Sequence, residues 1–179
     1  MRSIFLSMAA FSVIATANAE LTSSTTSGFT TVNEAIIDSD VATVWAVATQ
    51  RIGDWWHPSH TISGDASRMS IDAVPQGCFC ESLGENQGIV HLTVTFAQRP
   101  RLLRMTGGLG PLGLMGVNGN MLWEIEPDGE QTRVRFSYNV GGYSPDGLDS
   151  IAPAVDSVIG EALTRLKAFV ETGQPSADE

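Results

Sequence analysis

Positive charge is scarce in this sequence. Its 179 residues include 10 Lys and Arg against 20 Asp and Glu, which gives a formal net charge of −10 at pH 7. Nucleic-acid binding requires clustered basic side chains that neutralise phosphates, and docking on an anionic membrane surface requires them too. The composition therefore argues against nucleic acid as a partner and against docking on an anionic membrane.

Cysteine is almost absent, since Cys78 and Cys80 are the only two. So few cysteines do not make a disulfide scaffold. In an extended strand the Cα atoms of residues i and i+2 lie about 6.5–7 Å apart, at or beyond the limit for a bridge, so we expect no internal disulfide. The favoured interpretation is two small buried apolar side chains, and the alternative is a pair of thiols that point at a ligand.

Motifs for several kinds of chemistry are missing. No Gly-x-Ser-x-Gly nucleophile motif occurs, and no pair of carboxylates falls on the apolar faces. His57 and His60 together with the two cysteines would suit zinc in type, but their spacing matches no known zinc pattern, so we expect no metal and no cofactor. The G-x-G-x-x-G of residues 108–113 lacks a surrounding strand–helix–strand unit. We interpret it as an apolar loop, either a gate over a cavity or an ordinary hairpin connection.

Long apolar runs are also missing, apart from residues 4–15. A basic start precedes this run, and Ala17-Asn18-Ala19 follows it with the small-x-small pattern of a signal-peptidase site. The run is too short to span a bilayer. We therefore predict a secretory signal peptide over residues 1–19, cut after Ala19. The mature protein would be periplasmic or secreted, with no membrane anchoring after cleavage.

The strongest periodic signal lies near the C-terminus, roughly from Ser150 to Glu171. Its apolar residues recur at steps of three and four, so they form one broad stripe on a helix. They are Val155, Val158, Ile159, Ala162, Leu163, Leu166, Phe169 and Val170. Gly173 then provides a stop signal. A helix this long and one-sided must lie on an apolar surface.

Most of the chain upstream has the pattern of strands. A first strand over residues 29–37 precedes the Asp38-Ser39-Asp40 cap of a short helix, which one further turn extends as far as Trp56. Strands separated by turns then run from residue 68 to residue 140. In the last two strands apolar side chains alternate along one face, as Met121, Trp123, Ile125, Val134, Phe136, Tyr138 and Val140. The pattern predicts an α+β fold in which the last helix covers an antiparallel sheet.

Four segments make the chain resemble the START-like (SRPBCC) superfamily. They are Asp38–Trp45, Trp55–Pro58, Gly77–Leu83 and Glu161–Lys167. The resemblance implies a helix-grip fold over residues 28–173, in which a curved antiparallel sheet wraps around a long C-terminal helix and two short helices follow the first strand. It also implies a deep apolar cavity between sheet and helix. Residues 20–27, a polar Ser/Thr tract, would be a disordered leader, and residues 174–179 a C-terminal tail.

The hairpin over residues 78–97 offers one face of the expected cavity. If its turn is centred near Asn86, Cys78 and Cys80 share an apolar face with Val90, Leu92, Val94 and Phe96, while Glu81 and His91 form an ion pair on the other face. A one-residue slip or a bulge would invert this assignment.

The segment Trp55-Trp56-His57-Pro58-Ser59-His60 is the densest group of aromatic and imidazole side chains. It would form the cavity mouth, with His57 or His60 available for proton transfer. Alternatively, the Trp residues anchor the helix to the core and the histidines face solvent. Tyr138 is either an inward hydroxyl donor or a core aromatic. The expected ligand-binding residues are Trp56, Cys78, Cys80, Leu92, Val94, Met121, Trp123, Phe136, Tyr138 and Ala162.

Three functions follow from these patterns and from the resemblance. The first is binding of a small apolar molecule in the cavity. The second is an enzyme of the polyketide cyclase or dehydratase type that uses His57 or His60 as general acid or base. The third is a protein-interaction module like the heat-shock ATPase activator of this superfamily, which the predicted export disfavours because that chaperone partner is cytosolic. The sequence indicates neither the ligand nor the oligomeric state.

Overall fold

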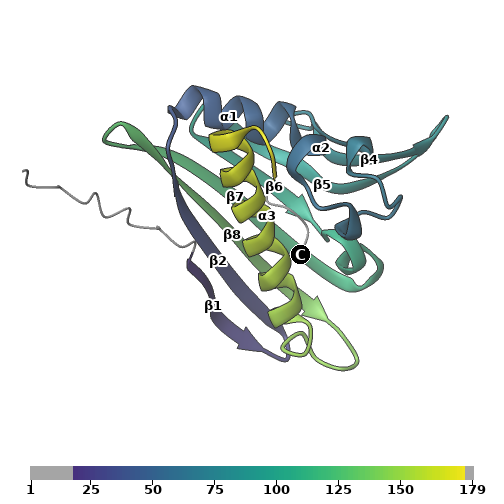
Figure 1. The fold of residues 1–179 in the computed structure, drawn as a ribbon. Helices are drawn as coiled ribbons and strands as arrows, with labels where there is room; N and C mark the ends of the chain where they lie inside the picture. Colours follow the sequence, from purple (N-terminus) through teal and green to yellow (C-terminus); the bar gives the residue numbers. More distant parts are fainter. Residues whose placement is uncertain (1–17, 176–179) are drawn as a thin grey trace, which may run out of the picture.

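A curved antiparallel sheet and a long helix form the framework of the protein (Figure 1). The computed structural model describes residues 18–175, so the predicted signal peptide lies almost wholly outside the described range, as do residues 176–179 of the predicted tail. The strands are β1 (Asn18–Thr25), β2 (Gly28–Ile37), β3 (Met69–Ile71), β4 (Cys78–Gly84), β5 (Gln87–Gln98), β6 (Leu102–Gly107), β7 (Gly116–Asp128) and β8 (Gln131–Tyr143). The helices are α1 (Val41–Gln50), α2 (Ile52–Trp55) and α3 (Ala152–Thr172), with 3₁₀ turns η1 (Pro58–His60), η2 (Ala66–Arg68) and η3 (Gly110–Leu114).

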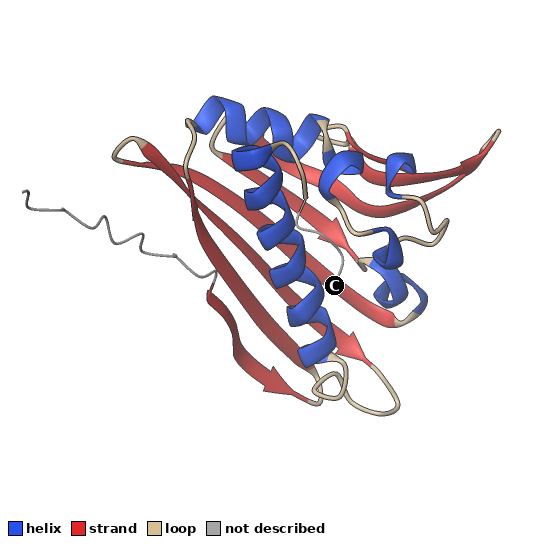
Figure 2. Ribbon diagram, viewed as in Figure 1, coloured by secondary structure: helices blue, strands red, loops and turns tan. Residues whose placement is uncertain are grey.

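The sheet places β2 beside β8, in the order β1-β2-β8-β7-β6-β5-β4-β3. The helices gather on one side of it (Figure 2). This is the α+β helix-grip fold that the sequence predicted. No helix within residues 18–175 is long and apolar enough to cross a membrane.

Helix α3 forms where its apolar stripe predicts it. Its buried side chains include Ile159, Leu163, Leu166 and Phe169, which pack on the sheet. The helix ends at Gly173, whose left-handed backbone (φ 76°) suits glycine and whose N–H donates to the carbonyl of Phe169. The helix thereby covers the apolar face of an otherwise half-exposed sheet.

Strand β1 corrects the expectation of a disordered leader over residues 20–27. Leu21 pairs with Thr31 and Thr25 with Gly28, so the polar tract is an edge strand of the sheet. An edge strand depends on backbone hydrogen bonds and on β-branched residues more than on apolar side chains. The threonines of this tract are β-branched. Composition alone did not reveal this pairing.

Two bulges in β5 set the faces of the β4–β5 hairpin. Phe79 pairs with Leu92 and Cys80 with Val90, so His91 is an extra residue on β5. Because of this bulge both His91 and Leu92 are buried. A second irregularity near Thr95 separates the pairs that Val94 and Phe96 make with β6.

The predicted inward face of this hairpin is therefore half wrong. Leu92 and Val94 are buried as expected, whereas Val90 and Phe96 are 62% and 43% exposed. Glu81 and His91 do pair across the strands, but on the buried side. Phe79 and Glu81 take the inward positions of β4 that were expected for the cysteines.

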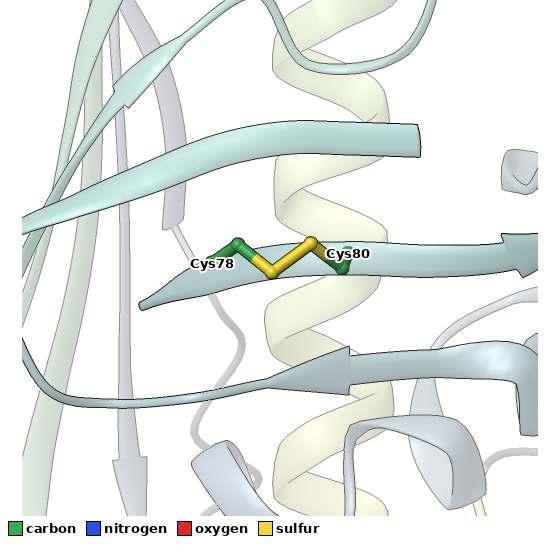
Figure 3. The surroundings of a disulfide bond; sticks show 2 residues. All are labelled: Cys78 and Cys80. Carbon is green, nitrogen blue, oxygen red and sulfur yellow. A yellow bond between two sulfur atoms is a disulfide. The ribbon is translucent and has the colours of Figure 1, made fainter. Parts of the chain in front are cut away.

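Cys78 and Cys80 form a disulfide on the other face of β4 (Figure 3), which contradicts the expectations of no internal disulfide and of cysteine side chains on the cavity face. Their Cα atoms lie 5.4 Å apart, well within the range for a bridge. The expected distance between the two Cα atoms assumed a regular extended strand. The pairing of β4 with β5 is irregular between Phe79 and Cys80. The bridge removes both sulfurs from any ligand or metal site.

A Cys78→Ser/Cys80→Ser double variant should keep the fold and lose about 1.5 kcal/mol of unfolding free energy, because so short a closed loop restricts the unfolded chain only slightly. Urea unfolding measures this difference. A reductant should lower the stability of the wild type by the same amount and leave the double variant unchanged. Unfolding of the double variant in plain buffer would contradict a peripheral role for the bridge.

Candidate functional site

A cavity of about 290 Å³ lies under the N-terminal half of α3. Its lining is almost entirely apolar. The walls come from α3 (Val155, Val158, Ile159), from the segment around η1 (Trp56, His60, Ile62), from the η3 loop (Leu109, Leu112) and from β5 (His91). Such a volume, with few polar groups, is typical of a site for a small molecule.

The expected catalytic and ligand-binding residues separate into three groups. Trp56 and His60 line the cavity, and His57 lies beside His60. Seven others are buried in the core and do not line the cavity, namely Leu92, Val94, Met121, Trp123, Phe136, Tyr138 and Ala162. Cys78 and Cys80 lie in the disulfide on the outer face of β4.

Aromatic packing explains why the cavity lies elsewhere than expected. Trp123 stacks on Phe136 with ring centroids 4.3 Å apart, and Trp55 lies 6.2 Å from Trp123. These rings fill the middle of the sheet. The space that remains is near the first turns of α3, where the lining side chains are those of Val155 and Val158 rather than Ala162.

His57, His60 and Glu161 form a polar cluster at the edge of the cavity. His60 Nε2 lies 2.8 Å from one carboxylate oxygen of Glu161, and His57 Nε2 lies 3.8 Å from the other. The three side chains are 22–39% exposed. They connect the segment around η1 to α3, which neither spacing nor periodicity indicated.

Within residues 18–175, these three side chains form the one group of His, Cys, Asp or Glu residues that could hold a metal ion. Their ligand atoms all lie within 4.8 Å of one another. However, the Ser59 N–H donates to His57 Nδ1 at 3.1 Å. The neutral imidazole then carries its proton on Nε2, the atom that a metal would have to bind. The absence of a metal therefore stays our prediction.

Glu81 and His91 form a second carboxylate–imidazole pair, and this one is buried. Their side chains are 0% and 3% exposed, and His91 Nε2 lies 3.0 Å from Glu81 Oε2. The carboxylate also accepts the backbone N–H groups of Ile62 and Ser63. Burial would raise the pKa of Glu81, but hydrogen bonds from Ser63, Ile62 and His91 outweigh it and lower the pKa to about 2.

His91 brings a polar group to the cavity wall that the sequence assigned to the opposite face. Its ring is held edge-on to Phe79, with centroids 5.8 Å apart, and it lines the cavity. His91 Nδ1 is buried and has no hydrogen-bond partner within the described part of the chain. The sequence pattern of apolar residues does not reveal the bulge in β5 that turns His91 inward.

Tyr138 anchors the η3 loop. Its hydroxyl donates to the Gly107 carbonyl at 2.7 Å and accepts the Leu109 N–H at 3.1 Å. Burial raises the pKa of Tyr138 to about 12, although the Leu109 N–H opposes the rise. Tyr138 is thus a core aromatic that holds the loop of Leu109 and Leu112 against the cavity.

Gly119 on β7 makes room for the Tyr138 ring, because a Cβ at this position would overlap the ring. Gly119→Ala should therefore shift Tyr138, lower the unfolding free energy by about 2 kcal/mol and loosen the η3 loop. Thermal unfolding and amide exchange of Leu109 measure the two effects. Gly116→Ala on the same strand is the control, since its Cβ would meet Tyr143 at an ordinary 3.4 Å. Equal effects of the two substitutions would contradict the steric argument.

Because of Glu81, the unfolding free energy of the protein should depend on pH in the acidic range. Its pKa falls from an ordinary 4.5 to about 2 on folding, so its contribution is full above pH 4.5 and is lost as the pH falls toward 2. The stability advantage of the wild type over Glu81→Gln should shrink by about 3 kcal/mol between about pH 5 and about pH 2. Urea unfolding at each pH measures it. Glu85→Gln, in the exposed β4–β5 turn, should show no such trend. A constant advantage of the wild type over Glu81→Gln would be the contrary result.

Comparisons with known proteins agree with this architecture. A conserved protein of unknown function from Enterococcus faecalis superposes with a TM-score of 0.61 at 15% identity, covering 90% of this chain and 82% of its own. CalU16 from Micromonospora echinospora gives 0.53 at 14%, with coverages of 90% and 88%. The Aha1 dimer from Colwellia psychrerythraea gives 0.54 at 16%, with coverages of 79% and 96%.

Identities this low establish the fold alone, and no curated protein matches the chain. A family model described as "Polyketide cyclase / dehydrase and lipid transport" matches residues 29–171, from the start of β2 to the end of α3. With most of its length inside this match, the chain belongs to the polyketide cyclase / dehydrase and lipid transport family.

Proposed function

We propose that this protein binds a small, mostly apolar molecule in the cavity beneath α3. The observation that carries the proposal is the cavity itself, about 290 Å³ of apolar lining with the imidazole of His91 in its wall. Transfer of an apolar molecule from water into such a lining is favourable, and the few polar side chains of the lining would orient it. The family and fold agree with a ligand-binding or cyclase-type domain.

A second candidate is proton-transfer catalysis of the cyclase or dehydratase type. The observation that favours it is the Glu81–His91 pair, an imidazole at the cavity with a carboxylate behind it. A general base must lie within hydrogen-bond reach of its substrate, and a carboxylate behind an imidazole can hold the ring in position for this role. In this candidate His91 takes the role that the sequence assigned to His57 or His60, since Glu161 already holds the Nε2 of His60.

Export to the periplasm or beyond is part of the proposal. The Cys78–Cys80 disulfide supports it, because disulfides persist in oxidising compartments and are rare in the cytosol. Cleavage after Ala19 would leave most of β1 in the mature chain.

Val158→Phe should fill the cavity and abolish ligand binding. Val158 lines the cavity on α3, whereas Val170, three turns further along, packs on the core outside it. Native mass spectrometry of the purified protein should find a co-purifying small molecule in the wild type and in the Val170→Phe control, and none in Val158→Phe. A ligand retained by Val158→Phe, or absent from all three proteins, would refute the proposed cavity site.

A further inference from the structure

The Cys78–Cys80 disulfide lies outside the cavity lining and has no part in the proposed function. Phe79 and Glu81 point to the buried side of β4, whereas both cysteines are partly exposed on the other face. Strand β4 is paired with β3 along one edge and with β5 along the other. Because this pairing covers the backbone, the exposed part of each cysteine is chiefly its side chain. The bridge is therefore within reach of a reagent in solution.

The neighbours of Cys80 leave this face of the sheet open. Cys80 pairs with Ser70 on β3 and with Val90 on β5, and paired residues project their side chains to the same face. Ser70 is exposed, and Val90 is 62% exposed. Helix α3 lies on the other side of the sheet, behind the bridge in Figure 3. A molecule that approaches the bridge meets sulfur beside a small hydroxyl and an exposed apolar side chain.

The fold does little to protect this bond. The bridge joins residues separated by two positions in the chain, and so short a loop removes little entropy from the unfolded state. Coupling is reciprocal, so the fold stabilises the bond by the same small amount by which the bond stabilises the fold. Structural disulfides resist reduction, whereas exposed disulfides are the labile, regulatory or catalytic ones. Exposure and weak coupling together place the bridge in the second class.

We propose that Cys78–Cys80 is a site of thiol–disulfide exchange and that its co-reactant is a dithiol. One thiolate of the dithiol attacks a sulfur of the bridge, forms a mixed disulfide and releases the other cysteine as a thiolate, which takes up a proton. The second thiol of the dithiol loses its proton and attacks the dithiol sulfur in the mixed disulfide. The dithiol becomes a disulfide, and the second cysteine is released. Two electrons and two protons thereby pass from the dithiol to the cysteine pair.

Reduction of the folded wild type tests the proposal. The protein is incubated with dithiothreitol or with reduced thioredoxin, a protein dithiol, and alkylation followed by intact-mass measurement counts its thiols. Both reagents should reduce the bridge in native buffer without changing the far-ultraviolet circular dichroism. Urea below the unfolding transition should leave the rate unchanged, because the folded protein itself reacts.

A rate that rises steeply with urea would show that the bridge reacts only after the fold opens, and this result would overturn the proposal. Failure of both reagents to reduce the folded protein would overturn it as well. Reduction by dithiothreitol alone would support the exchange site and restrict its co-reactants to small dithiols.

The exchange equilibrium with glutathione measures the coupling between bond and fold. The equilibrium constant for disulfide formation in the folded wild type should exceed that of the same chain unfolded in urea by only about tenfold. A ratio above about a hundredfold would identify a structural bridge and contradict the proposal.

Ser70 provides a matched pair of variants that keep both cysteines. Only the fold places Ser70 beside Cys80, and a charge there acts on the attacking and the leaving thiolates. Ser70→Lys should react with dithiothreitol about fivefold faster than Ser70→Glu at low salt, and high salt should bring the two rates together. Equal rates at low salt would show that the reaction does not take place on the folded β3–β4 pair, and the proposal would fail.

Gln131 supplies the control for net charge. It is exposed at the start of β8, which lies four strands from β4 in the sheet. Gln131→Lys and Gln131→Glu change the net charge as the Ser70 variants do, and they should react with dithiothreitol at equal rates. A rate difference as large as that of the Ser70 pair would assign the effect to net charge and count against the site.

Discussion

One buried carboxylate connects the parts that make the cavity. Glu81 extends from β4 to the backbone of Ile62 and Ser63 and to the His91 ring on β5. Those backbone groups belong to the loop after η1, whose side chains form one cavity wall. An ionised group is stable at 0% exposure only because three donors replace its water. Without Glu81 the loop would lose its attachment to the sheet, and His91 its fixed tautomer.

A single extra residue in β5 makes this arrangement possible. Because side chains alternate along a strand, the regular register would place Glu81 and His91 in solvent and the cysteines inside. The bulge at His91 reverses the assignment, so Phe79 and Glu81 face inward and Cys78 and Cys80 face outward. The same irregularity accompanies the Cα separation of 5.4 Å that permits the disulfide. The buried ion pair, the outer disulfide and the polar wall of the cavity thus share one cause.

The elements that the sequence predicted well are those with strong local signals. The stripe of α3, the Asp40 cap of α1 and the alternation from Met121 to Val140 all follow from periodicity or capping. Strand β1 and the register of β4–β5 depend on pairing between strands, which no local pattern determines. Trp56 and His60 could be predicted as site residues because Trp and His are rare in this chain and gather in one segment. The roles of Glu81, His91 and Glu161 required the tertiary contacts.

The two carboxylate–imidazole pairs differ chiefly in burial, and this difference separates their roles. His60 and Glu161 are 29% and 39% exposed, so water competes for their hydrogen bonds and their main effect is to attach η1 to α3. The side chains of Glu81 and His91 are shielded from water, so the tautomer of the His91 ring is fixed. The electrostatic effect of the Glu81 carboxylate is strong for the same reason. A fixed carboxylate behind an imidazole also holds the orientation of the ring. A carrier and an enzyme would therefore use the same geometry.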